Sequence, residues 1–298
     1  MSGLPRPVVT VGAIVLALAG LLVINNQVRV ARKRAASRVE AAAERRRDET
    51  FARGEIPAEL KAHRLALLEE LQPVTLQNCA LARVGSPHDG GYLMCHNLMA
   101  GLETAYSYGI GTEDRWGCAV STNRRVPVHQ YDCFSPTKVQ CTGGDLRLNA
   151  ECVGPRTESI DGKTFSTIAA QIAKNGDTGR RMVVKMDIEG AEWDAILATP
   201  DEVLAAIDQM PMELHGIDEP GVLPGLRKLK QHFHLVSVHF NNMACTYTAL
   251  PLPAIAYQVL FVNKRIGIVG PPPAGSLPPE TFMAPDGPGL PDCQTIKR

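Results

Sequence analysis

The run from Val183 to Asp194 most constrains the fold, because a strand pattern passes directly into a polar turn and a helix pattern. A strand rich in Val and Met is expected to be buried on both faces, as in a parallel sheet. The carboxyl edge of such a sheet forms its ligand crevice, and Asp187 and Glu189 fall there. In the purely structural alternative, Asp187 caps the next helix, Glu189 interacts with the positive end of that helix, and Gly190 supplies the turn.

Strand and helix patterns alternate through the rest of the chain, which predicts an α/β fold with a doubly wound, mostly parallel sheet. Strands are expected over residues 80–84, 92–95, 104–108, 126–132, 148–153, 183–186, 210–215, 234–239 and 257–263, and helices over residues 57–71, 164–174, 191–197, 201–207 and 223–232.

The N-terminal part of the chain is typical of a membrane anchor. Val8 to Ile24 carries no charge and is followed by a basic cluster. We therefore expect residues 1–27 to form a single-pass transmembrane helix, with a cleaved signal peptide as the alternative. Residues 28–70, rich in Ala, Arg, Glu and Leu, are expected to form a charged helical stalk whose second helix packs on the domain edge.

The remaining sequence divides into a domain and a tail. Residues 71–270 are expected to form the domain, and residues 271–298, which hold a Pro-Pro-Pro run, a Pro-rich, solvated and disordered tail. The 31 basic and 31 acidic residues leave a formal net charge of zero, so no global field attracts nucleic acid.

Two signals disagree on the side of the membrane. The basic cluster after the apolar segment favours the cytosolic face. The eight cysteines, without a CxxC pair, favour disulfides in an endomembrane lumen or outside the cell. Within the domain, Cys133 is expected to pair with Cys141 or Cys152.

Acids and glycines at neighbouring strand ends indicate a nucleoside site. Gly109 and Gly111 let the backbone approach a ligand closely, and Asp132, at the end of the next strand, can accept hydrogen bonds from ribose hydroxyls. A Gly-x-Gly-x-x-Gly cradle is missing, so a nucleoside without phosphates fits better than a dinucleotide.

These motifs resemble the FkbM-type and related methyltransferase-like domain families over roughly residues 71–266. The resemblance is carried by Asp89-Gly90-Gly91-Tyr92, Tyr108-Gly109-Ile110-Gly111, Tyr131-Asp132, Lys185-Met186-Asp187-Ile188-Glu189-Gly190-Ala191-Glu192 and Glu213-Leu214-His215. It implies a Rossmann-like class I fold and S-adenosylmethionine as cofactor. Many relatives have Phe-Glu where this chain has Tyr131-Asp132, so the acid here is shorter.

The resemblance also implies residue roles. Gly109 and Gly111 would lie beside the methionine part of the cofactor, and Asp132 would bind its ribose. Asp187 would lie near the transferred methyl group or the acceptor. Apart from the resemblance, the turn Asp89-Gly90-Gly91 is expected to fold over the cofactor, with an ordinary turn at His88 and Asp89 as the alternative.

Chemistry suggests which groups assist the transfer. Methyl transfer to a hydroxyl needs alignment and removal of a proton, for which Asp187, Glu213 and His215 are the expected catalytic residues. In a metal-assisted alternative, Asp187, Glu213 and His239, joined by His215 and Asn241, hold a divalent ion. For His239 and Asn241, a hydrogen-bonded strand end is the favoured interpretation. Trp193 is expected to pack against the sheet, and Glu192 to lie at the helix surface or support it.

The sequence thus predicts a membrane-anchored S-adenosylmethionine-dependent methyltransferase that methylates an oxygen of a small molecule or glycan. Two alternatives stay open. One is a non-catalytic, membrane-tethered interaction protein that keeps the fold, and the other is a metal-dependent hydrolase, for which the sequence offers no compact ligand motif.

Overall fold

The computed structural model describes residues 41–42, 45–46, 48–273 and 285–293. The chain forms two compact units, residues 1–55 and residues 56–298. The anchor that we predict over residues 1–27 lies outside the described residues, as does much of the stalk; residues 48–52 of the stalk are helical. Within the described part of the chain, no helix has both the length and the apolar character needed to cross a membrane.

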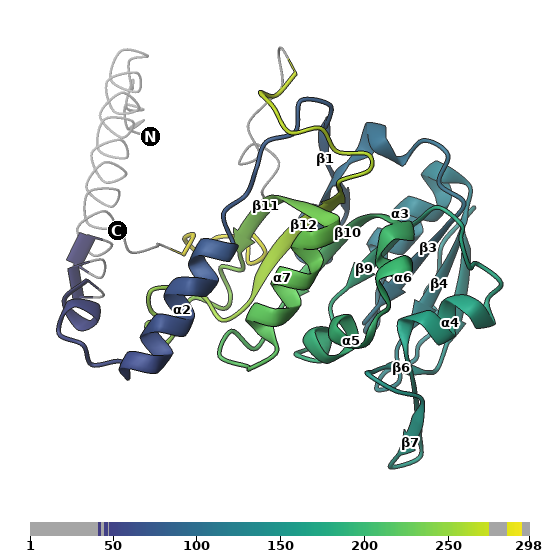
Figure 1. Cartoon of the computed structure of the whole chain (residues 1–298). Coiled ribbons are helices and arrows are strands. Elements are labelled where there is room, and N and C mark those ends of the chain that lie inside the picture. The colour runs from purple at the N-terminus through teal and green to yellow at the C-terminus, as the bar shows by residue number, and fades with distance from the viewer. Residues whose placement is uncertain (1–40, 43–44, 47, 274–284, 294–298) are drawn as a thin grey trace, which may run out of the picture. The chain divides into compact units, whose positions relative to one another are not determined.

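A seven-stranded mixed sheet forms the centre of the second unit (Figure 1). Its order is β11-β12-β10-β9-β3-β4-β5, in which β12 is antiparallel to both neighbours and every other neighbouring pair is parallel. The strands are β3 (Thr104–Tyr108), β4 (Pro127–Tyr131), β5 (Asp145–Asn149), β9 (Met182–Met186), β10 (Ile207–Leu214), β11 (Phe233–Phe240) and β12 (Tyr257–Asn263). The predicted α/β class and mostly parallel sheet are confirmed.

The direction of winding reverses beside β3. The chain adds β4 and then β5 on one side of β3, returns to place β9 on the other side, and continues outward to β10. The carboxyl ends of β3 and β9 therefore flank the topological switch point, where open α/β sheets form their ligand crevice.

Alternate side chains of the strands fill two cores, one on each face of the sheet. Met182, Val184 and Met186 of β9 lie in the core covered by helices, whereas Val183 faces the other core. The covering helices are α2 (Ala58–Glu70), α4 (Ile168–Lys174), α5 (Glu192–Ala198), α6 (Asp201–Ala206) and α7 (Val222–His232). The second face is covered by α3 (Arg115–Arg124) and a hairpin of β1 (Leu81–Gly85) and β2 (Gly91–Cys95).

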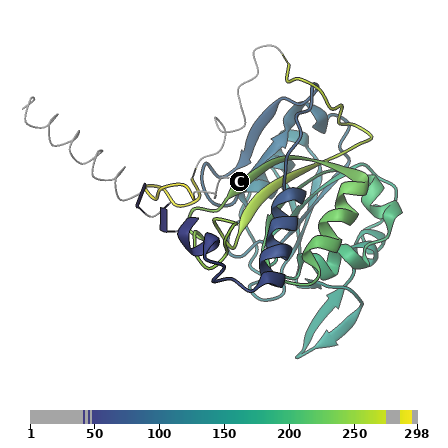
Figure 2. The ribbon, with the colours of Figure 1, turned by 60° about the vertical axis from the view of Figure 1, so that its left-hand side comes forward.

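Helix α2 belongs to the domain and not to the stalk in which we placed it. In Figures 1 and 2 it lies beside α7, and Lys230 of α7 forms a 2.7 Å ion pair with Glu70. Its Leu67 is fully buried, and its Arg64 is buried in a two-pronged pair with Asp218 at 2.6 and 2.7 Å. The expected packing of this helix is correct, but the boundary falls at residue 55.

Two local predictions were wrong, and helix α3 was not predicted. The strand expected over residues 148–153 is two strands, because β5 ends at Asn149 and β6 (Cys152–Val153) joins a separate sheet. The helix expected from residue 164 begins only at Ile168, since the Thr167 hydroxyl caps it by accepting a 3.1 Å bond from Ala170 N.

Residues just before that cap form β8 (Lys163–Ser166), which pairs with β6 and with β7 (Glu158–Ile160). This small sheet projects from the domain in both ribbon views (Figures 1 and 2).

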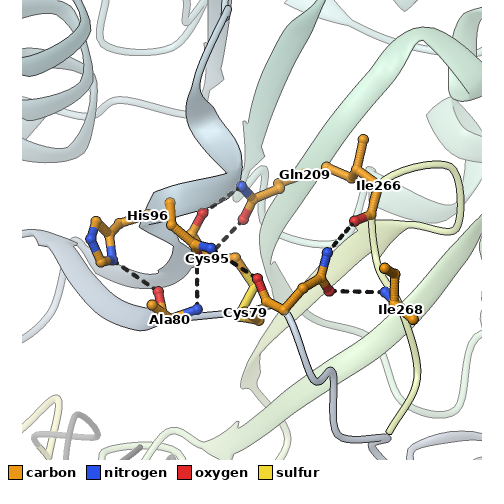
Figure 3. Close-up of a disulfide and its surroundings, with 9 residues drawn as sticks. Cys79, Ala80, Cys95, His96, Gln209, Ile266 and Ile268 are labelled. Atoms are coloured by element: carbon orange, nitrogen blue, oxygen red, sulfur yellow. Dashed lines mark hydrogen bonds between the residues drawn. A yellow bond between two sulfur atoms is a disulfide. The ribbon is translucent and has the colours of Figure 1, made fainter. Parts of the chain in front are cut away.

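All eight cysteines form disulfides, as their even number predicts. The pairs are Cys79–Cys95, Cys118–Cys141, Cys133–Cys152 and Cys245–Cys293. Of the two partners expected for Cys133, the structure selects Cys152. Figure 3 shows the Cys79–Cys95 disulfide, which closes the open end of the hairpin next to a 3-10 turn (His96–Met99). Gln209 of β10 exchanges hydrogen bonds of 2.8 and 2.9 Å with the Cys95 backbone.

The described part of the tail, residues 285–293, is not solvated along its whole length, contrary to our expectation. Asp286 is 3% exposed and accepts a 3.1 Å hydrogen bond from Gln258 of β12. Asn242 bonds to the backbone at Gly287, and Cys293 is tied to Cys245. A buried carboxylate and a disulfide hold this segment on the domain despite its proline content.

Candidate functional site

A pocket of about 880 Å³ opens at the switch point, at the carboxyl ends of β3, β4 and β9. The expected cofactor and acceptor residues Asp89, Gly109, Gly111, Asp132 and Asp187 line it, as does Glu189. The sheet brings together Gly109 and Asp187, which are 78 residues apart in the chain, because parallel strands deliver their carboxyl ends to one edge, and the turn between β1 and β2 adds Asp89.

Gly109 is required by a close approach of two backbones. A Cβ atom there would lie 1.6 Å from the carbonyl oxygen of Asp187, and its φ is +71°. The Gly109 N–H donates to the Tyr131 carbonyl at 3.0 Å, and the Asp187 N–H donates to the Tyr108 carbonyl at 3.2 Å. The ends of β3, β4 and β9 are thereby joined just below the pocket.

Asp132 organises the two loops that follow β3 and β4. Its Oδ2 accepts a 3.0 Å bond from Gly111 N, and its Oδ1 accepts bonds of 2.9 and 2.8 Å from the N–H groups of Phe134 and Ser135. This carboxylate therefore fixes the shape of the Gly-x-Gly turn and also faces the pocket. Ribose binding by Asp132 stays a prediction.

Asp187 is held by a lysine and a tyrosine that the sequence reasoning did not assign. The Tyr92 hydroxyl of β2 donates to Asp187 Oδ2 at 3.0 Å, and Lys185 Nζ lies 3.3 Å from the same oxygen. Lys185 also donates to the carbonyls of Tyr108 and Gly109, and its ammonium lies over the Tyr92 ring, 5.6 Å from the centroid. Burial and the Asp187 charge raise the pKa of Tyr92 well above its ordinary value, so this hydroxyl stays a donor.

The signal for Lys185 was present in the sequence, since a lysine inside a buried strand is rare unless paired. The signal for Tyr92 was not, because a tyrosine in a strand is usually a packing residue. Glu151 and the Cys133–Cys152 disulfide also line the pocket, and Glu151 pairs with Lys174 at 2.8 Å.

Glu192 builds the turn after β9. This carboxylate is fully buried and accepts hydrogen bonds of 3.0 Å from Ile188 N and 2.9 Å from Gly190 N. It also lies 3.0 Å from Nδ1 of His215. Of the two places that we offered for Glu192, the supporting one is correct and the surface one is wrong.

The same turn presents Glu189 to solvent. Glu189 has a left-handed backbone, with φ of +55°, and its side chain is 86% exposed. Trp193, one turn of helix further on, is buried and donates from Nε1 to the His215 carbonyl at 2.8 Å, so its expected packing role is confirmed.

Glu213 and His215, our other expected catalytic residues, do not line the pocket. Glu213 is 6% exposed and accepts a 2.8 Å hydrogen bond from Asn241. Burial and the neighbouring Asp187 charge raise the pKa of Glu213 to about 7. Burial lowers the pKa of His215, but its hydrogen bond with Glu192 and the charges of Glu192, Glu213 and Asp187 outweigh this and raise it to about 9.

The proposed metal ligand set needs correction. His239 lies 3.3 Å from the buried Asp286 of the tail, and Glu213 is bonded to Asn241. Among the described residues, the His, Asp and Glu side chains that converge are Asp187, Glu189 and His215, each with a ligand atom within 4.8 Å of the others. The sequence reasoning missed Glu189 as a ligand because its side-chain direction depends on the left-handed turn.

Carboxylates dominate the charge of the pocket wall. Six acids line the pocket, against the two cations Arg115 and Lys185. The acids are Asp89, Glu113, Asp132, Glu151, Asp187 and Glu189. Such a wall attracts cationic ligands and repels anionic ones.

Comparison with known proteins leaves the family open, since no protein-family model matches the chain and no curated protein matches it.

Proposed function

We propose that the domain is an S-adenosylmethionine-dependent methyltransferase that acts on an oxygen of a small molecule or glycan. The observation that carries the proposal is the assembly of Gly109, Gly111, Asp132 and Asp187 around one pocket at the switch point. These are the residues for which the resemblance to FkbM-type domains implies contact with the cofactor or the acceptor.

The sheet order supports the finer fold assignment, a Rossmann-like class I methyltransferase. If the parallel strands β3, β4, β5, β9 and β10 are numbered 1 to 5 in chain order, their order in the sheet is 3-2-1-4-5, which is doubly wound. The antiparallel β12 lies between β10 and the edge strand β11. A cofactor placed across the switch point would contact the turns after both β3 and β9.

The charges of the pocket favour a sulfonium cofactor over a dinucleotide. A pyrophosphate would need the N-terminus of the helix after β3, but Asp114 already caps α3 there by accepting a 2.7 Å bond from Gly117 N. A dianionic pyrophosphate would also face six carboxylates. S-adenosylmethionine carries a sulfonium and an ammonium against one carboxylate, so its net charge is complementary.

The reaction would be an in-line displacement. The acceptor oxygen forms a bond to the methyl carbon as the sulfur–carbon bond breaks, and the electron pair stays on sulfur as a neutral thioether. The hydroxyl proton passes to a carboxylate of the site. Asp187 faces the pocket and is the group that would orient the acceptor, whereas Glu213, buried behind it with a pKa of about 7, can store a proton near neutral pH.

We further infer that the domain works in an oxidising compartment, behind an N-terminal membrane anchor. Four disulfides with every cysteine paired support the lumenal or extracellular side over the cytosolic side suggested by the basic cluster. Protease protection of sealed vesicles that contain the full-length chain distinguishes the two orientations.

Isothermal titration of the full-length protein, with its disulfides intact, tests the function. We expect S-adenosylhomocysteine to bind with one site per chain, and Asp132→Ala to weaken that binding. Asp187→Asn should instead mainly lower turnover. Asp145→Asn is the matched control, because Asp145 is an exposed acid on β5, outside the pocket, that pairs with neighbouring Arg147. A folded protein that binds neither S-adenosylmethionine nor S-adenosylhomocysteine would contradict the proposal and favour the non-catalytic alternative.

A further inference from the structure

Three side chains converge in the way that metal ligands do, and two of them, Asp187 and Glu189, also line the pocket. Asp187 follows β9, Glu189 lies in the turn behind it, and His215 follows β10. Each offers one ligand atom, and these atoms all lie within 4.8 Å of one another. Two carboxylates and one imidazole are a ligand set suited to divalent first-row metal ions.

The histidine is oriented as in protein metal sites. Its Nδ1 lies 3.0 Å from the fully buried carboxylate of Glu192, so Nδ1 is engaged and Nε2 faces the gap, 3.6 Å from Glu189 Oε2. Metal-bound histidines commonly donate their second ring nitrogen to a carboxylate, which fixes the ring and the tautomer. Glu192 lies outside the ligand set and supplies this support independently of it.

The aspartate is oriented in a comparable way. Tyr92 and Lys185 both approach its Oδ2, at 3.0 and 3.3 Å, so that the carboxylate is held by one oxygen and Oδ1 is left for another partner. Glu189 differs, because its exposed side chain enters from solvent. Two fixed ligands and one solvent-facing ligand give an incomplete shell, which leaves positions for water or an acceptor oxygen.

Charge balance points to a divalent ion. The cluster and its support hold three carboxylates and one ammonium: Asp187 pairs with Lys185, whereas Glu189 and Glu192 lie against His215. With a neutral imidazole, two negative charges remain. A divalent cation balances these two charges.

We propose that Asp187, Glu189 and His215 bind a divalent first-row transition metal ion, of which Mn²⁺ is the representative. The role of the ion rests on the proposed function. An acceptor hydroxyl in an open coordination position would lose its proton more readily and would be held beside the methyl donor. The acceptors that suit this site are compounds with two adjacent oxygens, which can bind the ion together.

The test measures metal binding in the absence of any methyl donor. Full-length protein, purified with its disulfides intact and stripped by a chelator, is titrated with Mn²⁺ while electron paramagnetic resonance follows the free ion. We expect one Mn²⁺ per chain and competition by Zn²⁺. Glu189→Gln, at an exposed position, and His215→Gln should each weaken binding by about tenfold or more.

Asp194→Asn is the matched control, since Asp194 is an exposed acid in the first turn of α5 outside the cluster. Its affinity for Mn²⁺ should stay within about twofold of the wild type. Thermal unfolding of each variant checks that it is folded. Absence of stoichiometric binding to the wild type, or unchanged binding to folded Glu189→Gln, would overturn the site.

Titration of the same samples with S-adenosylhomocysteine separates the two proposals. If the protein binds Mn²⁺ but does not bind S-adenosylhomocysteine, the metal site stands and the methyltransferase proposal is contradicted. If the protein binds S-adenosylhomocysteine but does not bind Mn²⁺, the methyltransferase proposal stands and the metal site is contradicted.

Discussion

Replacement of Glu213 by glutamine should change how the stability of the protein depends on pH. Glu213 is 6% exposed, and burial together with the Asp187 charge raises its pKa from 4.5 to about 7. Glutamine keeps the shape of the side chain and keeps Oε1 as the acceptor for Asn241, 2.8 Å away. The variant therefore resembles a permanently protonated Glu213.

The size and sign of the effect follow from proton linkage. Between pH 4.5 and pH 7 the native state holds a proton on Glu213 that the unfolded chain has lost. The stabilisation is thus fully present below pH 4.5 and is lost as pH rises through about 7. From pH 5 to pH 8, wild-type stability should fall by about 2–3 kcal/mol relative to Glu213→Gln.

Urea unfolding of the full-length protein at pH 5 and pH 8, with its disulfides intact, measures this difference. Trp116 and Trp193 are both buried, so their fluorescence reports the transition. Glu202→Gln, an exposed acid on α6, is the matched control and should follow the wild type. Equal pH dependence of wild type and Glu213→Gln would refute the assignment of a raised pKa to this carboxyl.

Three further outcomes are expected. Gly109→Ala should destabilise the protein far more than Gly111→Ala in thermal unfolding. Both glycines have positive φ, but a Cβ at residue 109 would lie 1.6 Å from the Asp187 carbonyl oxygen, whereas one at residue 111 meets nothing within 4 Å. Equal losses of stability would argue against the close approach of the two backbones. Lys185→Met should remove the side-chain donor of the Gly109 carbonyl, which costs about 1–3 kcal/mol, whereas the Tyr108 carbonyl keeps its bond from Asp187 N. The variant should lower turnover more than it weakens S-adenosylhomocysteine binding. A change in binding alone would contradict the role of Lys185 in holding Asp187. The double change Cys133→Ser/Cys152→Ser opens a crosslink between residues 19 apart at the edge of the pocket, and it should reduce stability by about 3 kcal/mol and weaken S-adenosylhomocysteine binding. Cys245→Ser/Cys293→Ser should reduce stability without changing that affinity. Calorimetric titration measures both affinities, and equal effects would show that the disulfide at the pocket edge does not shape the binding site.

The α/β class and the strand ends that form the pocket could both be predicted from the sequence. A buried strand such as β9 is recognisable because its apolar run stops abruptly at Asp187, and parallel strands must end at one edge. Gly109, Gly111 and Asp132 could be predicted for the same reason. The start of the following helix could not be predicted in this way, because it depends on the capping hydroxyl of Thr167, and the residues just before it form a strand.

Which side chains meet, in contrast, depends on how the elements pack in three dimensions. Tyr92 reaches Asp187 because the hairpin folds over the second face of the sheet, and Lys185 faces it because side chains alternate along β9. Glu192 became a buried support, and Glu189 joined Asp187 and His215, because of one left-handed residue in the turn. Such contacts depend on side-chain direction in three dimensions, which strand and helix periodicity in the sequence does not specify.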